Sequence, residues 1–181
     1  AAERLAISES RPKPYLLNVN DVHFNVSRSG GFITVAVGST PLGVDIELID
    51  VEAYNEDVID TLFHDDEKRH INRHSSTARM SAFYEIWTRK EAFAKAVGIG
   101  MALDFAKFSV VQEEGKVLID DSFVSSEVWY ARSVETETEP ECRLAIASQL
   151  KNPQVKIVDW PMAPLTPVDR VSQNSGEHLL R

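Results

Sequence analysis

The sequence predicts an α+β fold. Residues 22–48 contain three consecutive strand-like runs, residues 75–97 form one long helical pattern, and further strand-like runs follow. Strands and helices therefore occur in separate blocks, without the regular alternation that a doubly wound parallel sheet needs. With 181 residues, 43% of them hydrophobic, the chain can build one sizeable core or two small lobes.

The first block is a series of three strands joined by turns. Residues 22–28 alternate between apolar and polar side chains, and the turn sequence Ser29-Gly30-Gly31 follows them. Phe32 to Val37 is apolar and rich in β-branched residues, as buried strands are. A second turn, Thr40-Pro41-Leu42-Gly43, leads into the alternating run from Val44 to Leu48.

Two helices are expected in the middle of the chain. From Glu47 to Glu67 there are nine acidic residues and no Lys or Arg. Asp66 and Glu67 begin a short helix, where their negative charges interact favourably with the helix dipole. The long helix covers residues 75–97, and Gly98 ends it. Its apolar residues recur at helical spacing: Met80, Phe83, Trp87 and Ala94.

After the long helix the sequence predicts more strands and then a tail. The strand-like runs are residues 105–111, 116–119, 128–132 and 143–147. Four of the eight prolines lie within the last 29 residues, which favours a tail that is extended or partly disordered.

Charge and cysteine content exclude several classes of protein. The 19 basic and 28 acidic residues give a formal charge of −9, which makes binding to nucleic acid or to an anionic membrane surface unfavourable. The single cysteine, Cys142, excludes an intrachain disulfide framework and a zinc site built from several cysteines. It fits a reducing compartment, and we expect the protein in the cytoplasm. The apolar runs are the length of strands and too short to span a membrane.

Two carboxylates lie on one face of the third predicted strand. Because strand side chains alternate between faces, Val44, Ile46 and Leu48 share one face, and Asp45 and Glu47 share the other. Neighbouring carboxylates repel each other unless a positive charge lies between them, and hard oxygen donors suit Mg²⁺ or Mn²⁺. A strand whose polar face is merely solvated is the alternative, and the strand alone favours that alternative.

The long helix carries a second group of charged residues. Glu91 follows Trp87 by one turn, and Lys95 follows Glu91 by one turn, so the carboxylate lies at the edge of the apolar stripe. A surface ion pair between Glu91 and Lys95 is the simpler interpretation of the helix alone.

Other candidates for chemistry are weaker. Backbone N–H groups of the turn that contains Ser27 and Ser29 could bind a phosphate, but a plain hairpin turn fits equally well. His64, His70 and His74 lack the glutamate of a metalloprotease motif, and we expect them to face solvent.

Taken in order, these motifs resemble those of the Sfp-type 4′-phosphopantetheinyl transferases. That family has a Lys-Pro element, an Asn-x-Ser-His-Ser-Gly turn, a Gly-(Val/Ile)-Asp-(Ile/Val)-Glu strand and a Trp-x-x-Lys-Glu-(Ala/Ser)-x-x-Lys helix. The resemblance runs from about Lys13 to Ala147. The matching segments are Lys13-Pro14-Tyr15, Asn25-Val26-Ser27-Arg28-Ser29-Gly30, Gly43-Val44-Asp45-Ile46-Glu47 and Trp87-Thr88-Arg89-Lys90-Glu91-Ala92-Phe93-Ala94-Lys95.

The resemblance implies an enzyme that transfers the phosphopantetheine arm of coenzyme A to a serine of an acyl or peptidyl carrier protein. The other product is 3′,5′-adenosine bisphosphate. Fatty-acid synthesis and several secondary-metabolite pathways use this reaction. The alternative is a catalytically impaired module of the same fold that binds coenzyme A or a carrier protein without turnover.

The resemblance also assigns residues. Asp45, Glu47 and Glu91 would hold Mg²⁺, with Mn²⁺ as a substitute. Glu91 would help to deprotonate the carrier serine, and Lys95 would neutralise phosphate oxygens or the leaving group. The residues expected to contact coenzyme A are Lys13, Pro14, Ser27, Arg28, Lys90 and Lys95.

Two departures from the family pattern stand out. Arg28 replaces the family histidine; it can still grip a phosphate but cannot titrate near neutral pH. The family fold has two similar α+β lobes, and most of the first lobe has no counterpart here. We therefore expect residues 1–43 to be the remainder of an N-terminal lobe, 44–150 to be the C-terminal lobe and 151–181 to be a proline-rich tail. Either a two-lobed monomer or self-association would complete the cleft.

A docking surface for the acidic carrier protein is expected near the helices. One candidate is the segment Gly98 to Phe108, which follows the long helix and, by the resemblance, would contact the carrier through Met101, Leu103 and Phe105. The other is a basic patch, although a helix that only balances the preceding acidic run is an equal alternative. The residues of this basic patch are Lys68, Arg69, Arg73, Arg79 and Arg89.

Overall fold

The computed structural model describes residues 5–8, 13–120, 127–138 and 141–159, and it confirms the α+β class. The strands are β1 (His23–Ser29), β2 (Phe32–Gly38), β3 (Leu42–Leu48), β4 (Phe108–Ser109), β5 (Leu118–Ile119), β6 (Tyr130–Val134) and β7 (Cys142–Ser148). The α-helices are α1 (Glu56–Leu62), α2 (Asp65–Ile71) and α3 (Ser76–Val97). Short 3₁₀ helices cover Gly100–Ala102, Phe105–Lys107 and Glu113–Gly115.

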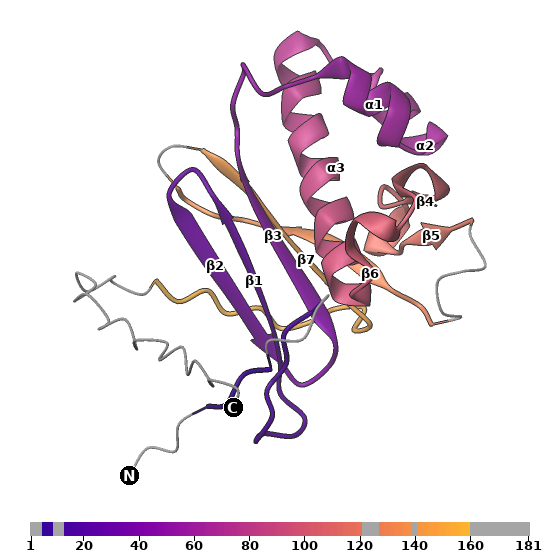
Figure 1. Cartoon of the computed structure of the whole chain (residues 1–181). Coiled ribbons are helices and arrows are strands. Elements are labelled where there is room, and N and C mark those ends of the chain that lie inside the picture. Colours follow the sequence, from indigo (N-terminus) through magenta and orange to yellow (C-terminus); the bar gives the residue numbers. More distant parts are fainter. Residues whose placement is uncertain (1–4, 9–12, 121–126, 139–140, 160–181) are drawn as a thin grey trace, which may run out of the picture.

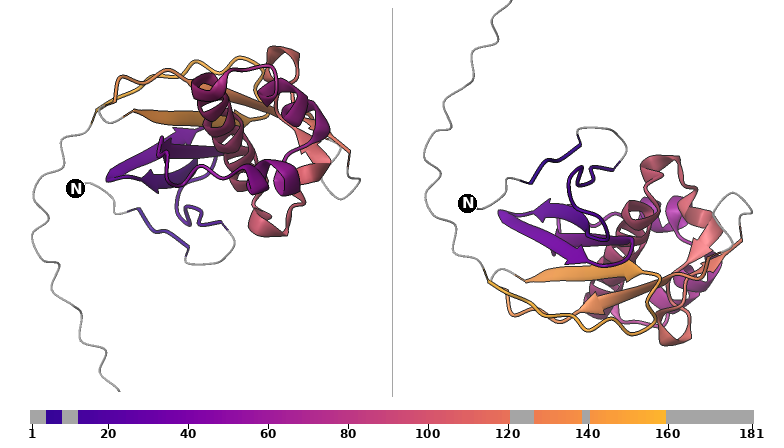
Figure 2. Two further views of the ribbon diagram at one scale, coloured as in Figure 1. Left: turned by 90° about the horizontal axis from the view of Figure 1, so that it is seen from above. Right: turned by 90° about the horizontal axis from the view of Figure 1, so that it is seen from below.

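The long helix α3 packs on an antiparallel sheet with the strand order β3-β7-β6 (Figure 1). The hairpin of β1 and β2 lies beside β3, while α1 and α2 lie at the other side of α3 (Figures 1 and 2). The two-stranded pair of β4 and β5 forms a separate small sheet. No helix in the described part of the chain is both long enough and apolar enough to cross a bilayer.

The hairpin turns at two glycines. Gly30 and Gly31 have φ values of 54° and 89°, and they join Ser29 to its cross-strand partner Phe32. A two-residue loop with positive φ at both positions matches the right-handed twist of the flanking strands, and glycine adopts it without steric cost. The turn predicted at these residues is therefore confirmed.

Polar side chains of β1, rather than backbone groups, bind the neighbouring edge of β3. The Asn25 Oδ1 atom accepts a hydrogen bond from the Val44 N–H at 2.9 Å, and the Ser29 Oγ atom accepts one from the Leu48 N–H at 3.1 Å. Ser27 lies between them on the same face of β1, and both Asn25 and Ser27 are buried. This polar seam satisfies N–H groups that an edge strand would otherwise bury without partners.

The contact between α3 and β3 is unusually close at Gly43. A Cβ atom on Gly43 would lie 2.0 Å from the Ala92 carbonyl oxygen and 2.4 Å from the Ala96 backbone nitrogen. Only glycine fits there, because both neighbouring atoms belong to the helix backbone and cannot rotate away. Ala145 and Ala147 on β7 are fully buried, so small side chains continue under the helix.

Aromatic side chains fill the core on the side of α3 that carries α1 and α2. Phe83 stacks on Phe63 with ring centroids 5.4 Å apart, and the ring centroids of Trp87 and Phe105 are 5.8 Å apart. Phe93 packs against Phe108 at 4.9 Å. These contacts bury the apolar stripe that predicted the long helix.

Two sequence predictions differ from the structure. Residues 105–111 were expected to form one strand, but a 3₁₀ helix begins after Asp104, whose side chain accepts from the Ala106 N–H, and only Phe108–Ser109 remain as strand. Helix α1 was not predicted within the acidic run. Asn55 caps it by accepting from the Asp57 N–H at 2.9 Å, an ordinary N-cap signal that acidic composition obscured.

The C-terminal tail is described only in part. Residues 151–159 form no helix or strand and are almost all exposed, which agrees with an extended segment. Residues 160–181 of the predicted tail lie outside the described residues. The division into segments 1–43, 44–150 and 151–181 stays a prediction.

We predict that Gly43→Ala lowers the free energy of unfolding by about 3 kcal/mol or more, because the new Cβ atom must push β3 away from α3. Gly31→Ala is the matched control: a Cβ atom there meets nothing within 4 Å, and only the positive φ opposes it, at a cost of about 1 kcal/mol. Urea unfolding of the three proteins measures both effects. Equal losses in the two variants would contradict the close contact described here.

Candidate active site

A polar cavity of about 560 Å³ lies where the hairpin, β3 and α3 meet. Its lining residues come from three elements that are far apart in sequence. They are Val26, Ser27 and Arg28 on β1, Asp45 and Glu47 on β3, and Trp87, Glu91 and Lys95 on α3. The cavity therefore brings together the carboxylates of β3 and the charged side chains of α3.

The close contact at Gly43 explains why these side chains meet. Gly43, Asp45 and Glu47 share one face of β3, and this is the face that lies against α3 at Gly43. On the helix, Glu91 and Lys95 are one turn apart and lie on the same side. The strand carboxylates are thereby held next to the helix carboxylate and ammonium.

Asp45 is the most buried charged group of the cavity, with 2% of its surface exposed. Its Oδ1 atom accepts hydrogen bonds from the Lys95 Nζ atom at 2.6 Å and from the Ser27 Oγ atom at 2.8 Å. Its Oδ2 atom is buried and has no hydrogen-bond partner. Burial raises the pKa of Asp45 to about 6, although Lys95 and Ser27 favour the ionised form.

Glu91 has a similarly raised pKa of about 6. Burial is the main cause, and repulsion from Asp45 and Glu47 adds to it, while Lys95 opposes it. Glu47 is partly exposed, and its Oε2 atom accepts a hydrogen bond from the Ser29 Oγ atom at 2.8 Å. Three carboxylates thus share a cavity, and Lys95 makes an ion pair with one of them, Asp45.

The donor set of this cavity fits a hard divalent cation. An unpartnered buried carboxylate oxygen is costly in a protein, and a metal ion would satisfy the Asp45 Oδ2 atom and offset the repulsion among the carboxylates. Within the described residues, however, no three His, Cys, Asp or Glu side chains are already close enough together to hold a metal ion. The Lys95 ammonium, rather than a second carboxylate, is the charged group in contact with Asp45.

A second cavity, of about 290 Å³, lies beside the N-terminal segment, and Lys13 and Pro14 line it. The Lys13 Nζ atom donates to the Leu42 carbonyl at 2.6 Å and to the Ala96 carbonyl at 3.3 Å. Burial lowers the pKa of Lys13. Lys13 therefore ties its segment to the start of β3 and the end of α3.

The structure places Lys90 away from both cavities, contrary to the expectation that it contacts coenzyme A. Its side chain is fully buried, and the Nζ atom donates to the Glu67 Oε2 atom at 2.6 Å and to the Phe108 carbonyl at 2.7 Å. Neighbouring residues on a helix point about 100° apart, so Lys90 and Glu91 face different surroundings. Nothing in the local sequence indicates Glu67 as the partner of Lys90.

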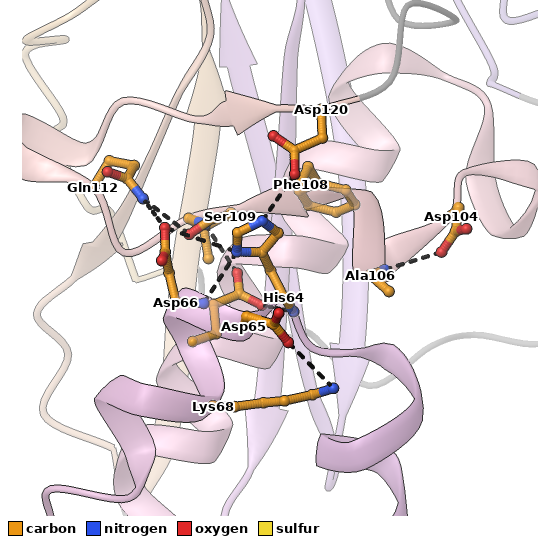
Figure 3. Close-up of polar contacts among 12 residues, drawn as sticks. His64, Asp65, Asp66, Lys68, Asp104, Ala106, Phe108, Ser109, Gln112 and Asp120 are labelled. Carbon is orange, nitrogen blue, oxygen red and sulfur yellow. Dashed lines mark hydrogen bonds and ion pairs between the residues drawn. The ribbon is translucent and has the colours of Figure 1, made fainter.

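His64 does not face solvent, contrary to the expectation from sequence. It is the N-cap of α2, where its Nδ1 atom accepts from the Asp66 N–H at 3.1 Å. Its Nε2 atom lies 3.0 Å from the Asp120 Oδ2 atom (Figure 3). The Glu67 side chain accepts a hydrogen bond from the His64 backbone N–H and completes a capping box. His64 thus anchors α2 to the segment that ends at Asp120.

We predict that Lys90→Met lowers the free energy of unfolding by about 3 kcal/mol, because it leaves the Glu67 carboxylate buried without its cation. Lys68→Met is the matched control, because its partner Asp65 is 80% exposed and the loss of a surface ion pair should cost less. The double variant Glu67→Gln/Lys90→Met should recover part of the loss. Urea unfolding measures all three, and a fully stable Lys90→Met protein would contradict the buried ion pair.

We predict that Glu91→Gln stabilises the protein at pH 7 by about 1 kcal/mol, a figure reduced for solvent screening because this carboxyl is only half-buried. The folded pKa of about 6 exceeds the usual 4.5, so the folded state binds the proton more tightly. Ionisation of Glu91 therefore costs stability as the pH rises from 4.5 to 6, and the gain should vanish below that window. Urea unfolding across this range tests the sign. Exposed Glu52→Gln is the control, and a destabilised Glu91→Gln protein at pH 7 would refute the prediction.

Comparison with known proteins agrees with the geometry. Residues 41–146 match the family model of the 4′-phosphopantetheinyl transferase superfamily. A 4′-phosphopantetheinyl transferase of Bacillus subtilis is 35% identical over 109 residues, which are 60% of this chain and 48% of that protein. The transferase gsp of Aneurinibacillus migulanus is 30% identical over 99 residues, 55% of this chain and 41% of that protein.

This chain thus spans about half the length of the curated relatives it matches. A solved structure of Thermotoga maritima holo-[acyl-carrier-protein] synthase is 19% identical, with a TM-score of 0.48 over 60% of this chain and 61% of that one. The family model covers more than half of the present chain and includes β3, α3 and most of β7. The chain therefore belongs to the 4′-phosphopantetheinyl transferase superfamily.

Proposed function

We propose that this chain carries the metal and coenzyme sites of a Mg²⁺-dependent 4′-phosphopantetheinyl transferase, which converts an apo acyl or peptidyl carrier protein to its holo form. The observation that carries the proposal is the buried Asp45, which has one unpartnered oxygen and shares a cavity with Glu47, Glu91 and Lys95. The names of the relatives support the same reaction class. A cytoplasmic location is part of the proposal.

Asp45, Glu47 and Glu91 would hold the metal through hard oxygen donors, with Mg²⁺ preferred and Mn²⁺ as a substitute. When bound, the ion supplies Lewis-acid stabilisation of the charge that develops on the pyrophosphate of coenzyme A. The raised pKa values of Asp45 and Glu91 fit this role, because burial and repulsion between the carboxylates disfavour their ionised forms, which a bound cation would stabilise.

Glu91 is the proposed base for the carrier serine. A carboxylate with a pKa of about 6 is ionised at neutral pH and is a stronger base than an ordinary glutamate, so it can accept the hydroxyl proton. The serine oxygen then attacks the β-phosphorus of coenzyme A, the bond from that phosphorus to the bridging oxygen breaks, and 3′,5′-adenosine bisphosphate leaves.

The basic side chains that line the two cavities have different proposed roles. Arg28 and Lys95 line the first cavity with Ser27 and would bind phosphate oxygens, where the planar Arg28 guanidinium can donate two parallel hydrogen bonds. Lys13 and Pro14 line the second cavity and would contact the adenine end of coenzyme A. Lys90 is left out of the coenzyme site because its side chain is fully buried against Glu67.

The structure weakens both docking surfaces that are expected from sequence, without testing either. Four of the five residues of the basic patch already pair with acidic neighbours, namely Lys68 with Asp65, Arg69 with Asp66, Arg79 with Glu56 and Arg89 with Glu85. Leu103 and Phe105 are buried in the core and cannot supply apolar contact to a partner. The carrier protein stays a proposed partner, as does completion of the cleft by a second lobe or by self-association.

We predict that an apo carrier protein incubated with this chain, coenzyme A and Mg²⁺ gains about 340 Da, the mass of the transferred arm. Intact-mass spectrometry measures the gain. Asp45→Ala should reduce the rate by at least about 100-fold, because the buried metal ligand is lost. Glu52→Ala, at an exposed acidic residue outside both cavities, should leave the rate unchanged.

Other outcomes decide between the remaining possibilities. Coenzyme A binding without mass gain on several carriers would replace the transferase with a binding module of the same fold, the alternative that the Arg28 substitution suggests. Neither binding nor gain would refute the proposed function for this chain. A folded Asp45→Ala protein that transfers at the full rate would refute the metal site.

A further inference from the structure

A metal ion at Asp45 would compete with the Lys95 ammonium for the same carboxylate. Its Nζ atom is 2.6 Å from the Asp45 Oδ1 atom and 2.8 Å from the Ser27 Oγ atom, so one cation already contacts this carboxylate. Ser27 in turn donates to the same Asp45 oxygen at 2.8 Å. The three groups form a closed triangle of hydrogen bonds.

Two cations cannot share Asp45 without strong repulsion, because the carboxylate is buried and screening by water is weak. The Asp45 Oδ2 atom is buried and without a partner, so Lys95 satisfies only half of the carboxylate. Lys95 itself is 29% exposed and lies on a flexible four-carbon stem. It can therefore leave Asp45 without unfolding α3, whereas the strand carboxylate cannot move.

We propose that Lys95 is a resident cation of the metal-free site, and that a divalent cation binds at Asp45 by displacing its ammonium group. This inference rests on the proposed function, since it takes Asp45 as a metal ligand. Displacement leaves the ammonium in the first cavity, beside Arg28, free to contact a phosphate. Metal binding and phosphate binding are then coupled through one side chain, so that each increases the affinity for the other.

The direct test observes the Lys95 ammonium by ¹⁵N NMR in the full chain, with Mg²⁺ as the only addition. Hydrogen bonds to Asp45 and Ser27 should slow its exchange with water and make its signal visible, and Lys95→Met identifies that signal. Saturation with Mg²⁺ should abolish the signal or shift it strongly. A signal that is unchanged at saturating Mg²⁺, or a chain that binds no Mg²⁺ in calorimetry, overturns the proposal.

A second test compares Mg²⁺ affinity by calorimetry in mildly alkaline buffer, where the carboxylates are ionised in every variant. Lys95→Met should bind Mg²⁺ at least about threefold more tightly than the parent protein, since the competing cation is gone. Arg28→Met is the matched control: Arg28 lines the same cavity but makes no ion pair within the described part of the chain, so its effect should be smaller. Equal effects of the two variants, or weaker binding by Lys95→Met, would count against displacement.

Neither test uses coenzyme A or a carrier protein, so its result is independent of the transfer assay. Transfer activity combined with an unmoved Lys95 signal would leave the proposed function standing and remove the displacement mechanism. Displacement of Lys95 without transfer activity would support the displacement mechanism and remove the proposed function.

Discussion

The contact between the backbones of β3 and α3 at Gly43 is the constraint on which the site depends. Since no side chain separates strand from helix there, Asp45 lies directly against the turn of α3 that carries Glu91 and Lys95. A larger residue at position 43 would separate the elements and weaken both the core and the site. The packing of α3 on β3 and the geometry of the cavity therefore depend on the same backbone contact at Gly43.

The polar seam between β1 and β3 extends this arrangement to the hairpin. Asn25 and Ser29 replace the backbone hydrogen bonds of a continuous sheet, and Ser27 reaches the carboxylate of Asp45 instead. The hairpin can thus lie beside β3 while a cavity stays open between them. Burial is the main cause of the raised pKa values of Asp45 and Glu91, so ionisation of these carboxylates lowers the stability of the folded protein at neutral pH.

Two lysines on α3 have opposite roles, which explains why a helix motif alone is a poor guide to function. Lys90 forms a fully buried ion pair with Glu67 and holds the carbonyl of Phe108, so it joins α2, α3 and β4. Lys95 is partly exposed in the first cavity and pairs with Asp45. Both belong to the same nine-residue motif, yet Lys90 is buried in the core and Lys95 lines the cavity.

The sequence by itself determined the strands around Gly30-Gly31, the limits of the long helix and the shared face of Asp45 and Glu47, because these features follow from local periodicity and turn chemistry. It also indicated the family through the order of its motifs. Only the tertiary structure decided that Lys90 pairs with Glu67, that His64 caps a helix and that Leu103 is buried. Those outcomes depend on residues distant in the chain, and their positions relative to each other are fixed by packing rather than by local sequence.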